Sequence, residues 1–518
     1  MFNKWFHPSA HKYLHFVGCL LIGVGLPLNK VVMSIGTIWV ISNIVFEADY
    51  RSYLGRLKRN TLFLSIAGIF ILHFIGILWS EDYSYAFGDI RSKLPLLIIP
   101  LALIARPLEK EFLPIVLNGL LVSLLITSTI NLSTFYFNNH FTDGTDIRFL
   151  SLFGSHIRYG LLVLFGVIIA FSKVNIRNIF TWIWALIGLW LVFYTFVAQV
   201  MSLYFAAFFL VFALSIYYIF KLNSKRLKTL LLLTFATCLA GFVFFIYSEL
   251  KPSQTTESFE HLETRTSFGN NYYHDTTLHI QENGHYVMLY IQEEELAYEW
   301  NKKSNIPHDS LDLKGQELMG TLIRYMTSKG LRKDAEGFER LSKKDIRNIE
   351  QGIPSYRYVE SPLTERLEGI KHQIQYYLEG GHSSGHSLLQ RFEHWKASIY
   401  ILKKNWLIGV GTGDVQQQFN HAYRAIDTDL AENQRNRAHN QYMTFWVSFG
   451  ILGLILLLLF SWQLVFQAIS NKSLIALSFG LITIASFLPE DTLETQQGVT
   501  FVAFFIGLLP AFGSKKEI

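Results

Sequence analysis

The chain has 518 residues, of which 51% are hydrophobic, 15% are aromatic and only 16% are charged, and its mean hydropathy is +0.27. An ordinary soluble domain carries about 25% charged residues. This composition therefore excludes a disordered chain, a collagen-like fibre and a small disulfide-stapled module, and it argues against a soluble enzyme. We expect an α-helical polytopic membrane protein with a sizeable water-exposed part.

Twelve apolar runs are long enough, or nearly long enough, to span a bilayer. The fourth run is short and contains Pro95 and Pro100, so it is the weakest of them. The first run lacks a small-residue cleavage site, which favours an uncleaved span. The predicted spans cover 13–29, 31–46, 61–79, 93–105, 112–137, 156–172, 179–197, 200–220, 229–248, 440–468, 474–488 and 498–513.

The distribution of basic residues sets the predicted topology, because Lys and Arg are enriched on the cytoplasmic side of membrane proteins. With a cytoplasmic N-terminus, 17 of them fall inside and 5 in short outer loops. Residues 249–440 carry 23 basic and 27 acidic residues, against 22 and 13 in the rest. We expect nine spans in 1–248, a periplasmic loop domain over 249–438 and three spans in 439–518, with both termini cytoplasmic. Inner-side charge of this kind indicates topology, and nucleic-acid binding is not expected.

The long outer segment is predicted to have structure of its own. Residues 272–291 alternate on either side of Glu282-Asn283-Gly284, which predicts a β-hairpin. Residues 387–408 have apolar side chains at three- to four-residue spacing among charged ones, which predicts a helix along the membrane interface. We therefore expect a small α+β element, with further helices at 292–303, 311–329, 333–351 and 362–379.

The glycine-rich stretch 409–414 follows this helix. It does not follow a strand and has no Lys of a nucleotide-binding loop, so nucleotide binding is rejected. A tight backbone turn beside a lipid headgroup is the interpretation that we keep for it.

Polar clusters gather at the predicted outer ends of the spans. For any single residue, contact with lipid headgroups is the simpler explanation. Together, however, Arg side chains that bind phosphate in bidentate fashion and a His that takes a proton near neutral pH suit an anionic lipid substrate. The clusters are Arg435, Arg437 and His439; His156 and Arg158; Glu490, Asp491 and Glu494; and Arg391 with His394.

A metal or cofactor is not expected. The sequence contains no HExxH, CxxC or GxSxG motif, and Cys19 and Cys238 both lie in apolar runs. A metal-independent mechanism is therefore favoured.

The order of several motifs resembles the signature of the O-antigen ligase and O-antigen polymerase superfamily, most closely the version found in Bacteroidetes. The motifs cover about 385–500, and the twelve-span plan with its large outer loop resembles the family over the whole chain. They are Arg391–Trp395, Gly409–Asp414, Arg437–Tyr442, Gly450–Gly453 and Glu490–Gln496.

This resemblance implies a GT-C-like membrane glycosyltransferase of the bacterial inner membrane that uses neither a metal nor a nucleotide sugar. The donor would be a glycan on undecaprenyl diphosphate, and the acceptor a hydroxyl of lipid A-core or of a growing glycan. The family's histidine maps onto His439 as general base, and its loop arginine maps onto Arg391 as diphosphate ligand. The remaining expected substrate-binding residues are Arg437, Arg435, Arg158, His156, Asp414 and Glu490.

One departure from the family is evident. Many members carry a Ser-Arg pair at the outer start of a middle span, whereas this chain has Ser202 followed by Leu203. Another Arg, with Arg158 the first choice, is expected to replace it, unless the donor site differs or the chain is inactive.

Several functions remain open. Ligase is the first choice, polymerase the second, and a protein O-glycosyltransferase would use the same motifs. A non-enzymatic transporter of lipid-linked glycan would predict charges in the middle of spans and internal repeats. The charges instead gather at the outer ends, which favours surface chemistry.

Overall fold

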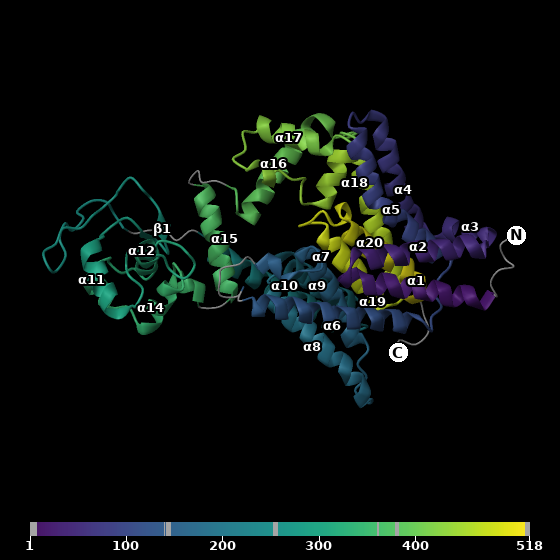
Figure 1. The fold of residues 1–518 in the computed structure, drawn as a ribbon, viewed down its shortest axis with the longest axis horizontal. Helices are drawn as coiled ribbons and strands as arrows, with labels where there is room; N and C mark the ends of the chain where they lie inside the picture. The colour runs from purple at the N-terminus through teal and green to yellow at the C-terminus, as the bar shows by residue number, and fades with distance from the viewer. Residues whose placement is uncertain are drawn as a thin grey trace. The chain divides into compact units, whose positions relative to one another are not determined.

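The computed structural model describes residues 8–138, 140, 147–251, 257–359, 362–378 and 383–512. It is mostly helical, and its contacts divide the chain into two compact units. The first unit comprises Met1–Phe141, Thr145–Asn223 and Gln390–Ile518, and the second comprises Thr142–Gly144 and Ser224–Leu389. Figure 1 shows the course of the chain.

Each of the twelve predicted apolar runs largely coincides with a helix, so the expectation of a helical polytopic protein is confirmed in this coarser form. Among the described residues, eight helices are long and apolar enough to cross a membrane, and α7, α19 and α20 are shorter. The helix α5 (Tyr83–Ala105) begins ten residues before its predicted run and falls in neither group. The count of twelve spans stays a prediction. The other helices are α1 (Pro8–Leu28), α2 (Lys30–Glu47), α4 (Thr61–Ile75), α6 (Leu113–Phe137), α7 (His156–Ser172), α8 (Trp182–Ala198), α9 (Met201–Lys221), α10 (Lys225–Leu250), α18 (Gln441–Ser470), α19 (Leu474–Ser486) and α20 (Gln496–Phe512).

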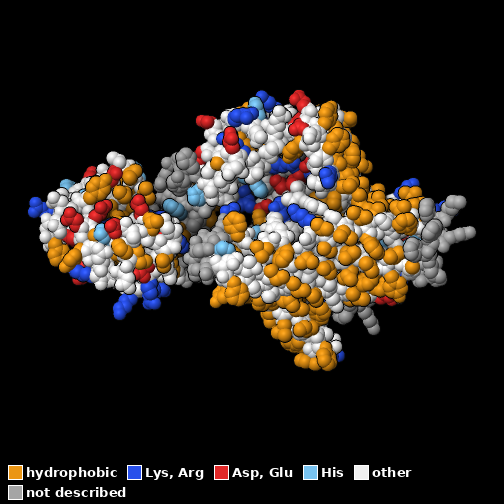
Figure 2. Space-filling view, in the orientation of Figure 1, with side chains coloured by type: hydrophobic (Ala, Val, Ile, Leu, Met, Phe, Trp, Pro, Cys, Tyr) orange, Lys and Arg blue, Asp and Glu red, His pale blue; other side chains and the backbone are white. Residues whose placement is uncertain are grey.

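The core of the first unit forms around α20, which is buried along nearly its whole length. Phe501 and Phe505 stand one turn apart on α20 and pack edge-on against Phe165 of α7, with 4.7 Å between the centroids of Phe165 and Phe505. A Cβ at Gly507 would lie 2.6 Å from Cβ of Leu103 on α5, so this glycine permits the close approach of the two helices. The outward surface of the unit is broadly hydrophobic, as a bilayer requires (Figure 2).

A short amphipathic helix, α3 (Tyr50–Arg59), also belongs to this unit and was not expected. Its last turn carries three basic residues, and the Arg56 guanidinium donates a hydrogen bond to the carbonyl of Ala105 at the end of α5.

The glycine-rich stretch after α16 (Ser387–Asn405) is buried against α18, so the expectation of a headgroup-facing turn is wrong. Gly409 and Gly450 both have positive φ, and a Cβ at Gly450 would lie 2.1 Å from the Leu407 carbonyl oxygen. The backbone N–H of Gly411 donates to the Ser448 carbonyl at 2.9 Å. The glycines therefore allow this loop to hydrogen-bond directly to a kinked helix, for which any side chain would be too large.

The second unit contains the predicted hairpin. Strands β1 (Gln281–Glu282) and β2 (His285–Tyr286) pair antiparallel about Asn283 and Gly284, whose φ values of 53° and 87° suit a type I′ turn. The unit also contains α11 (Glu293–Lys303), α12 (Leu318–Ser328), α13 (Ala335–Glu339), α14 (Lys343–Glu350) and α15 (Pro362–Leu378).

Two helices of this unit are shorter than the sequence predicts. The helix predicted from 311 begins at Leu318, because the Asp312 carboxylate accepts hydrogen bonds from the backbone of Lys314 and Gln316 and forms a turn there. The helix predicted over 333–351 is two helices, because Ser342 and Asp345 form a capping box that starts a new one.

Candidate functional site

Three polar side chains from different helices of the first unit, and one from the segment before α18 (Gln441–Ser470), meet at the carboxylate of Glu490, which lies between α19 and α20 and is 1% exposed. Arg391 of α16 places Nη2 2.7 Å from Oε1, and Ser202 of α9 places its hydroxyl 3.3 Å from the same oxygen. Arg158 of α7 lies 4.0 Å from Oε2, and Nδ1 of His439 lies 3.6 Å from it. We call these five residues the Glu490 hub.

Backbone groups on either side of Glu490 hold the hub together. The Pro489 carbonyl accepts a hydrogen bond from Nε of Arg391 at 3.3 Å, and the Asp491 carbonyl accepts one from Arg158 at 3.2 Å. The Asp491 carboxylate accepts from the backbone N–H of His439 at 3.0 Å and from the Thr444 hydroxyl at 2.8 Å. The loop 489–491 thus fixes both arginines and the segment that carries His439.

His439 is held in an uncommon conformation and remains accessible. Its φ is 46°, in the left-handed region that a histidine seldom adopts, directly before the N-cap Asn440 of α18. Its side chain is 33% exposed. Its ring packs against that of His394, with 5.0 Å between centroids. Strained residues of this kind cluster at functional sites, where the surrounding structure determines them.

The surroundings set the protonation of the hub. Burial acts to raise the pKa of Glu490, but His439, followed by Arg391 and Arg158, outweighs burial and holds that pKa below its usual range. Burial raises the pKa of Asp491 and lowers that of His394 to about 4. Glu490 is therefore an anion at neutral pH, and the His394 ring is neutral.

Several polar atoms in this region have no hydrogen-bond partner among the described residues, although they are buried. They are Nδ1 of His439, Oε2 of Glu490, Nε of Arg158 and Nδ1 of His394. Such atoms are rare in folded proteins, and four together point to a place where a ligand supplies the missing bonds. Figure 2 shows basic, acidic and histidine side chains gathered in a hollow of this unit.

A second cluster of charges lies beside the hub and is nearly closed to solvent. Arg437 pairs with Glu494 and lies 3.1 Å from Oδ1 of Asp89. The Lys93 ammonium lies 2.6 Å from Asp89 and 2.7 Å from Glu494, and Tyr85 accepts from Nε of Arg437 at 3.2 Å. Two cations and two anions balance here, so we call these residues the Arg437 network.

The part of the chain that contains Arg391 and His439 matches a known protein family. Residues 343–458 match the family model described as O-Antigen ligase. This stretch of the chain is therefore similar to the O-antigen ligase family. This match confirms, for residues 343–458, the resemblance inferred from the motifs. No curated protein matches the chain.

The matched residues include Arg391 and His439, whereas Arg158, Ser202 and Glu490 lie outside them. The hub thus joins three expected site residues, Arg391, His439 and Arg158, around the fourth, Glu490.

The other expected residues lie outside the hub, and their predicted substrate contacts stay predictions. Both oxygens of Asp414 accept hydrogen bonds from the backbone N–H of Glu81, and one also accepts from Asp82, so Asp414 holds the turn before α5. His156 hydrogen-bonds to the Ala198 carbonyl at 2.9 Å. Arg435 donates to the Leu430 carbonyl, and the Arg437 guanidinium is neutralised in its own network.

The sequence interpretation missed Asp89 and Lys93 of the network, and it treated Ser202 as a departure from the family without a role. Asp89 and Lys93 stand four residues apart just before an apolar run, which is the spacing of an intrahelical ion pair. That signal was available. The contact of Ser202 with Glu490 joins residues 288 positions apart and left no local signal.

Proposed function

We propose that this protein transfers a glycan from undecaprenyl diphosphate to a hydroxyl of lipid A-core, with the chemistry at the Glu490 hub. The observation that carries the proposal is the meeting of two guanidinium groups and one accessible imidazole at a single buried carboxylate. Polymerisation of the glycan, or transfer to a protein, would use the same chemistry with another acceptor.

The two arginines suit a diphosphate leaving group. Two guanidinium groups lie at one carboxylate in the hub, and guanidinium is the side-chain group that binds phosphate oxygens in bidentate fashion. Arg391 and Arg158 are held by backbone carbonyls, so their forks are oriented before the substrate arrives. Negative charge grows on the diphosphate as its bond to the sugar breaks, and fixed guanidinium groups stabilise that state more than the ground state.

The imidazole suits the acceptor. Glu490 faces Nδ1 of His439, which favours a proton on Nδ1 and leaves Nε2 as the base. The acceptor hydroxyl gives its proton to Nε2 while its oxygen bonds to the anomeric carbon. The bond from that carbon to the diphosphate oxygen breaks, and undecaprenyl diphosphate leaves. This division of roles needs an orienting carboxylate beside the histidine, and the distance of 3.6 Å between Nδ1 of His439 and Oε2 of Glu490 supports it.

We also propose on which side of the membrane the reaction takes place. The hub is assigned to the periplasmic side of the bacterial inner membrane, where lipid-linked glycan and lipid A-core meet, and the segment 249–438 to the same side. Both termini are assigned to the cytoplasm, and membrane lipids surround the helices of the first unit.

Gene deletion with analysis of surface glycans tests the assignment. We expect lipid-linked polymer to accumulate unattached and wild-type protein to restore attachment. Attachment of single repeats would instead indicate a polymerase, and unmodified proteins with normal lipopolysaccharide would indicate a protein glycosyltransferase; either would contradict the ligase assignment.

A matched pair of variants assigns the role to His439. His439→Asn keeps a residue that tolerates the left-handed backbone but removes the base, and we expect it not to restore attachment. His261 is exposed and has a φ of 59°, so His261→Asn makes the same change outside the hub and should restore attachment.

A further inference from the structure

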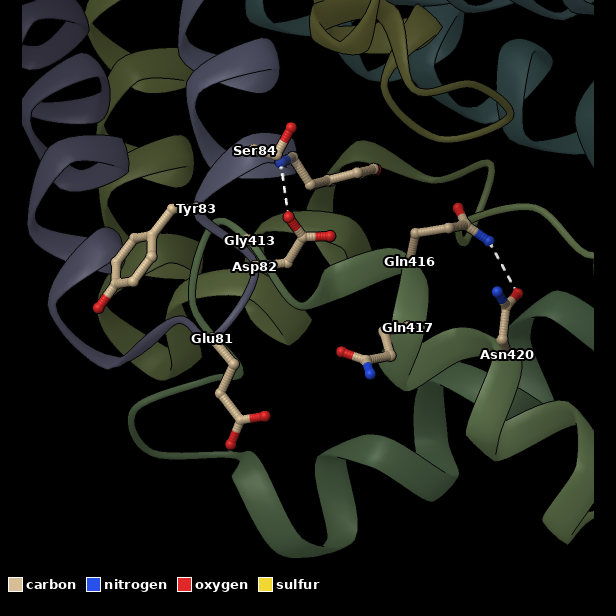
Figure 3. A pocket seen from close by; sticks show the side chains of 9 residues that line it. Glu81, Asp82, Tyr83, Ser84, Gly413, Gln416, Gln417 and Asn420 are labelled. Carbon is tan, nitrogen blue, oxygen red and sulfur yellow. Dashed lines mark hydrogen bonds between the residues drawn. The ribbon is translucent and has the colours of Figure 1, made fainter.

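A shallow, wide-mouthed cavity of about 780 Å³ lies between the start of α5 and α17 (Val415–Ala425), within the first unit (Figure 3). This volume lies in the range of small-molecule binding sites, about 300–1,000 Å³. The cavity is lined by two carboxyl groups, three side-chain amides, a serine and two tyrosines, and no described lining residue is Lys, Arg or His. Its chemistry therefore differs from that of the Glu490 hub.

This lining suits a ligand rich in hydroxyl groups. An amide offers a donor and an acceptor side by side, and a carboxylate offers two acceptors, so the set can pair with hydroxyls that both donate and accept. A phosphate would find two carboxylates and no cation. Figure 3 shows the Gln417 amide directed toward the space between Glu81 and Asp82, where no described residue bonds to it. The Gln416 and Asn420 amides form a second donor–acceptor pair at 3.1 Å.

The cavity is linked to the segment that carries His439. The Tyr85 hydroxyl, on one wall, accepts a hydrogen bond from Arg437. The Gln416 amide, on the other wall, donates to the Arg435 carbonyl at 2.9 Å. Both walls therefore bond to the stretch 435–437, which ends two residues before His439. A ligand in the cavity would therefore contact side chains that hydrogen-bond to the stretch leading to the proposed base.

We infer that this cavity binds neutral sugar residues of an oligosaccharide substrate, away from the bond that reacts. The inference rests on the proposed function for its substrate class. Sugar binding here holds the glycan beside residues that hydrogen-bond to 435–437, while the hub holds the charged group. The glycan is that of the donor or that of the acceptor core, and both present the same hydroxyl chemistry.

Binding of soluble oligosaccharides to the purified full-length protein tests the inference. The probes are the repeat-unit oligosaccharide released from the lipid-linked donor and the core oligosaccharide released from lipopolysaccharide, each without phosphate. We expect one of them to bind wild type and His439→Asn equally, because the cavity is intact in both. Binding to His439→Asn is independent of transfer, so failure of the proposed function would not be mistaken for failure of this inference.

Substitutions in the cavity provide the decisive comparison. Gln417→Ala removes an exposed amide and should weaken binding roughly five- to tenfold, the effect of one lost hydrogen bond. Ser84→Trp places a bulky ring on one wall of the cavity and should weaken binding more than Gln417→Ala does. Gln418→Ala is the matched control, because Gln418 is adjacent on α17 and does not line the cavity. Binding of the repeat unit places the donor glycan here, and binding of the core places the acceptor. No binding of either sugar, or equal binding by Ser84→Trp and wild type, would overturn the inference.

Discussion

Arg391 contacts both Glu490 and the carbonyl of the preceding Pro489, so its orientation is fixed from two sides. Lysine keeps the charge at this position but cannot make the forked contact. We expect Arg391→Lys to lower kcat/KM for the lipid diphosphate donor by about tenfold to a hundredfold, in line with the strength of charge-assisted pairs. Arg424 is exposed on α17, and Arg424→Lys should leave kcat/KM unchanged. Equal rates for both variants would remove Arg391 from the mechanism.

His394 makes the stability of the folded protein depend on pH. Burial among the groups of the hub lowers its pKa from 6.5 to about 4, so the folded state disfavours its protonated form. The free energy of unfolding is therefore highest above about pH 6.5 and decreases as the pH falls toward 4. In this window His394 takes up a proton in the unfolded chain but not in the folded one. We expect the Tm of the detergent-solubilised protein to fall across this window. In His394→Gln the fall should be shallower, and a fall of unchanged slope would show that other groups cause it.

At the scale of the element, the N-terminal half of α5 contributes Asp89 and Lys93 to the Arg437 network. The stability of this network depends mainly on the balance of its charges. Lys93 is 1% exposed and neutralises Asp89 and Glu494. Lys93→Met leaves a buried carboxylate unpaired, which costs roughly 3–5 kcal/mol and should lower Tm strongly. Adding Asp89→Asn restores the balance and should recover most of the loss. Arg91→Met removes an exposed cation from the same helix and should change Tm little. Failure of the double variant to recover would mean that the network acts through its geometry and not its charge.

At the scale of the whole molecule, the positions of the helices could be predicted from the sequence better than the contacts between side chains. Each of the twelve predicted apolar runs corresponds to a helix in the structure, because the length and hydropathy of a run are local properties of the sequence. The start of α12 and the break after α13 were missed, because side chains of Asp312 and Ser342 compete for backbone hydrogen bonds there.

The contacts of the candidate site were likewise not predictable from the sequence. The residue types of the hub were identified from the sequence, whereas the division of the arginines between hub and network was not. Arg158 and Arg437 look alike as outer-end cations. Their separate roles depend on which carboxylate each meets, Glu490 or Glu494, across loops and helices that are distant in the chain.

The topology is a further prediction for the whole molecule. In a chain without native cysteines, Thr276→Cys in the second unit should react with an impermeant maleimide in spheroplasts. Asn223→Cys, between α9 and α10, should react only after the membrane is opened. Both positions are exposed, so access to the reagent depends on the side of the membrane. The reverse pattern would show that one predicted span before α9 is absent, with α5 the first to reconsider.

The central claim is that the Glu490 hub transfers a glycan with His439 as base. Its most direct test reconstitutes the purified protein in liposomes with a labelled glycan on undecaprenyl diphosphate and with lipid A-core. We predict that wild-type protein and His261→Asn move the label to lipid A-core and release undecaprenyl diphosphate in equal amounts, while His439→Asn does neither. Full transfer by His439→Asn would contradict the account.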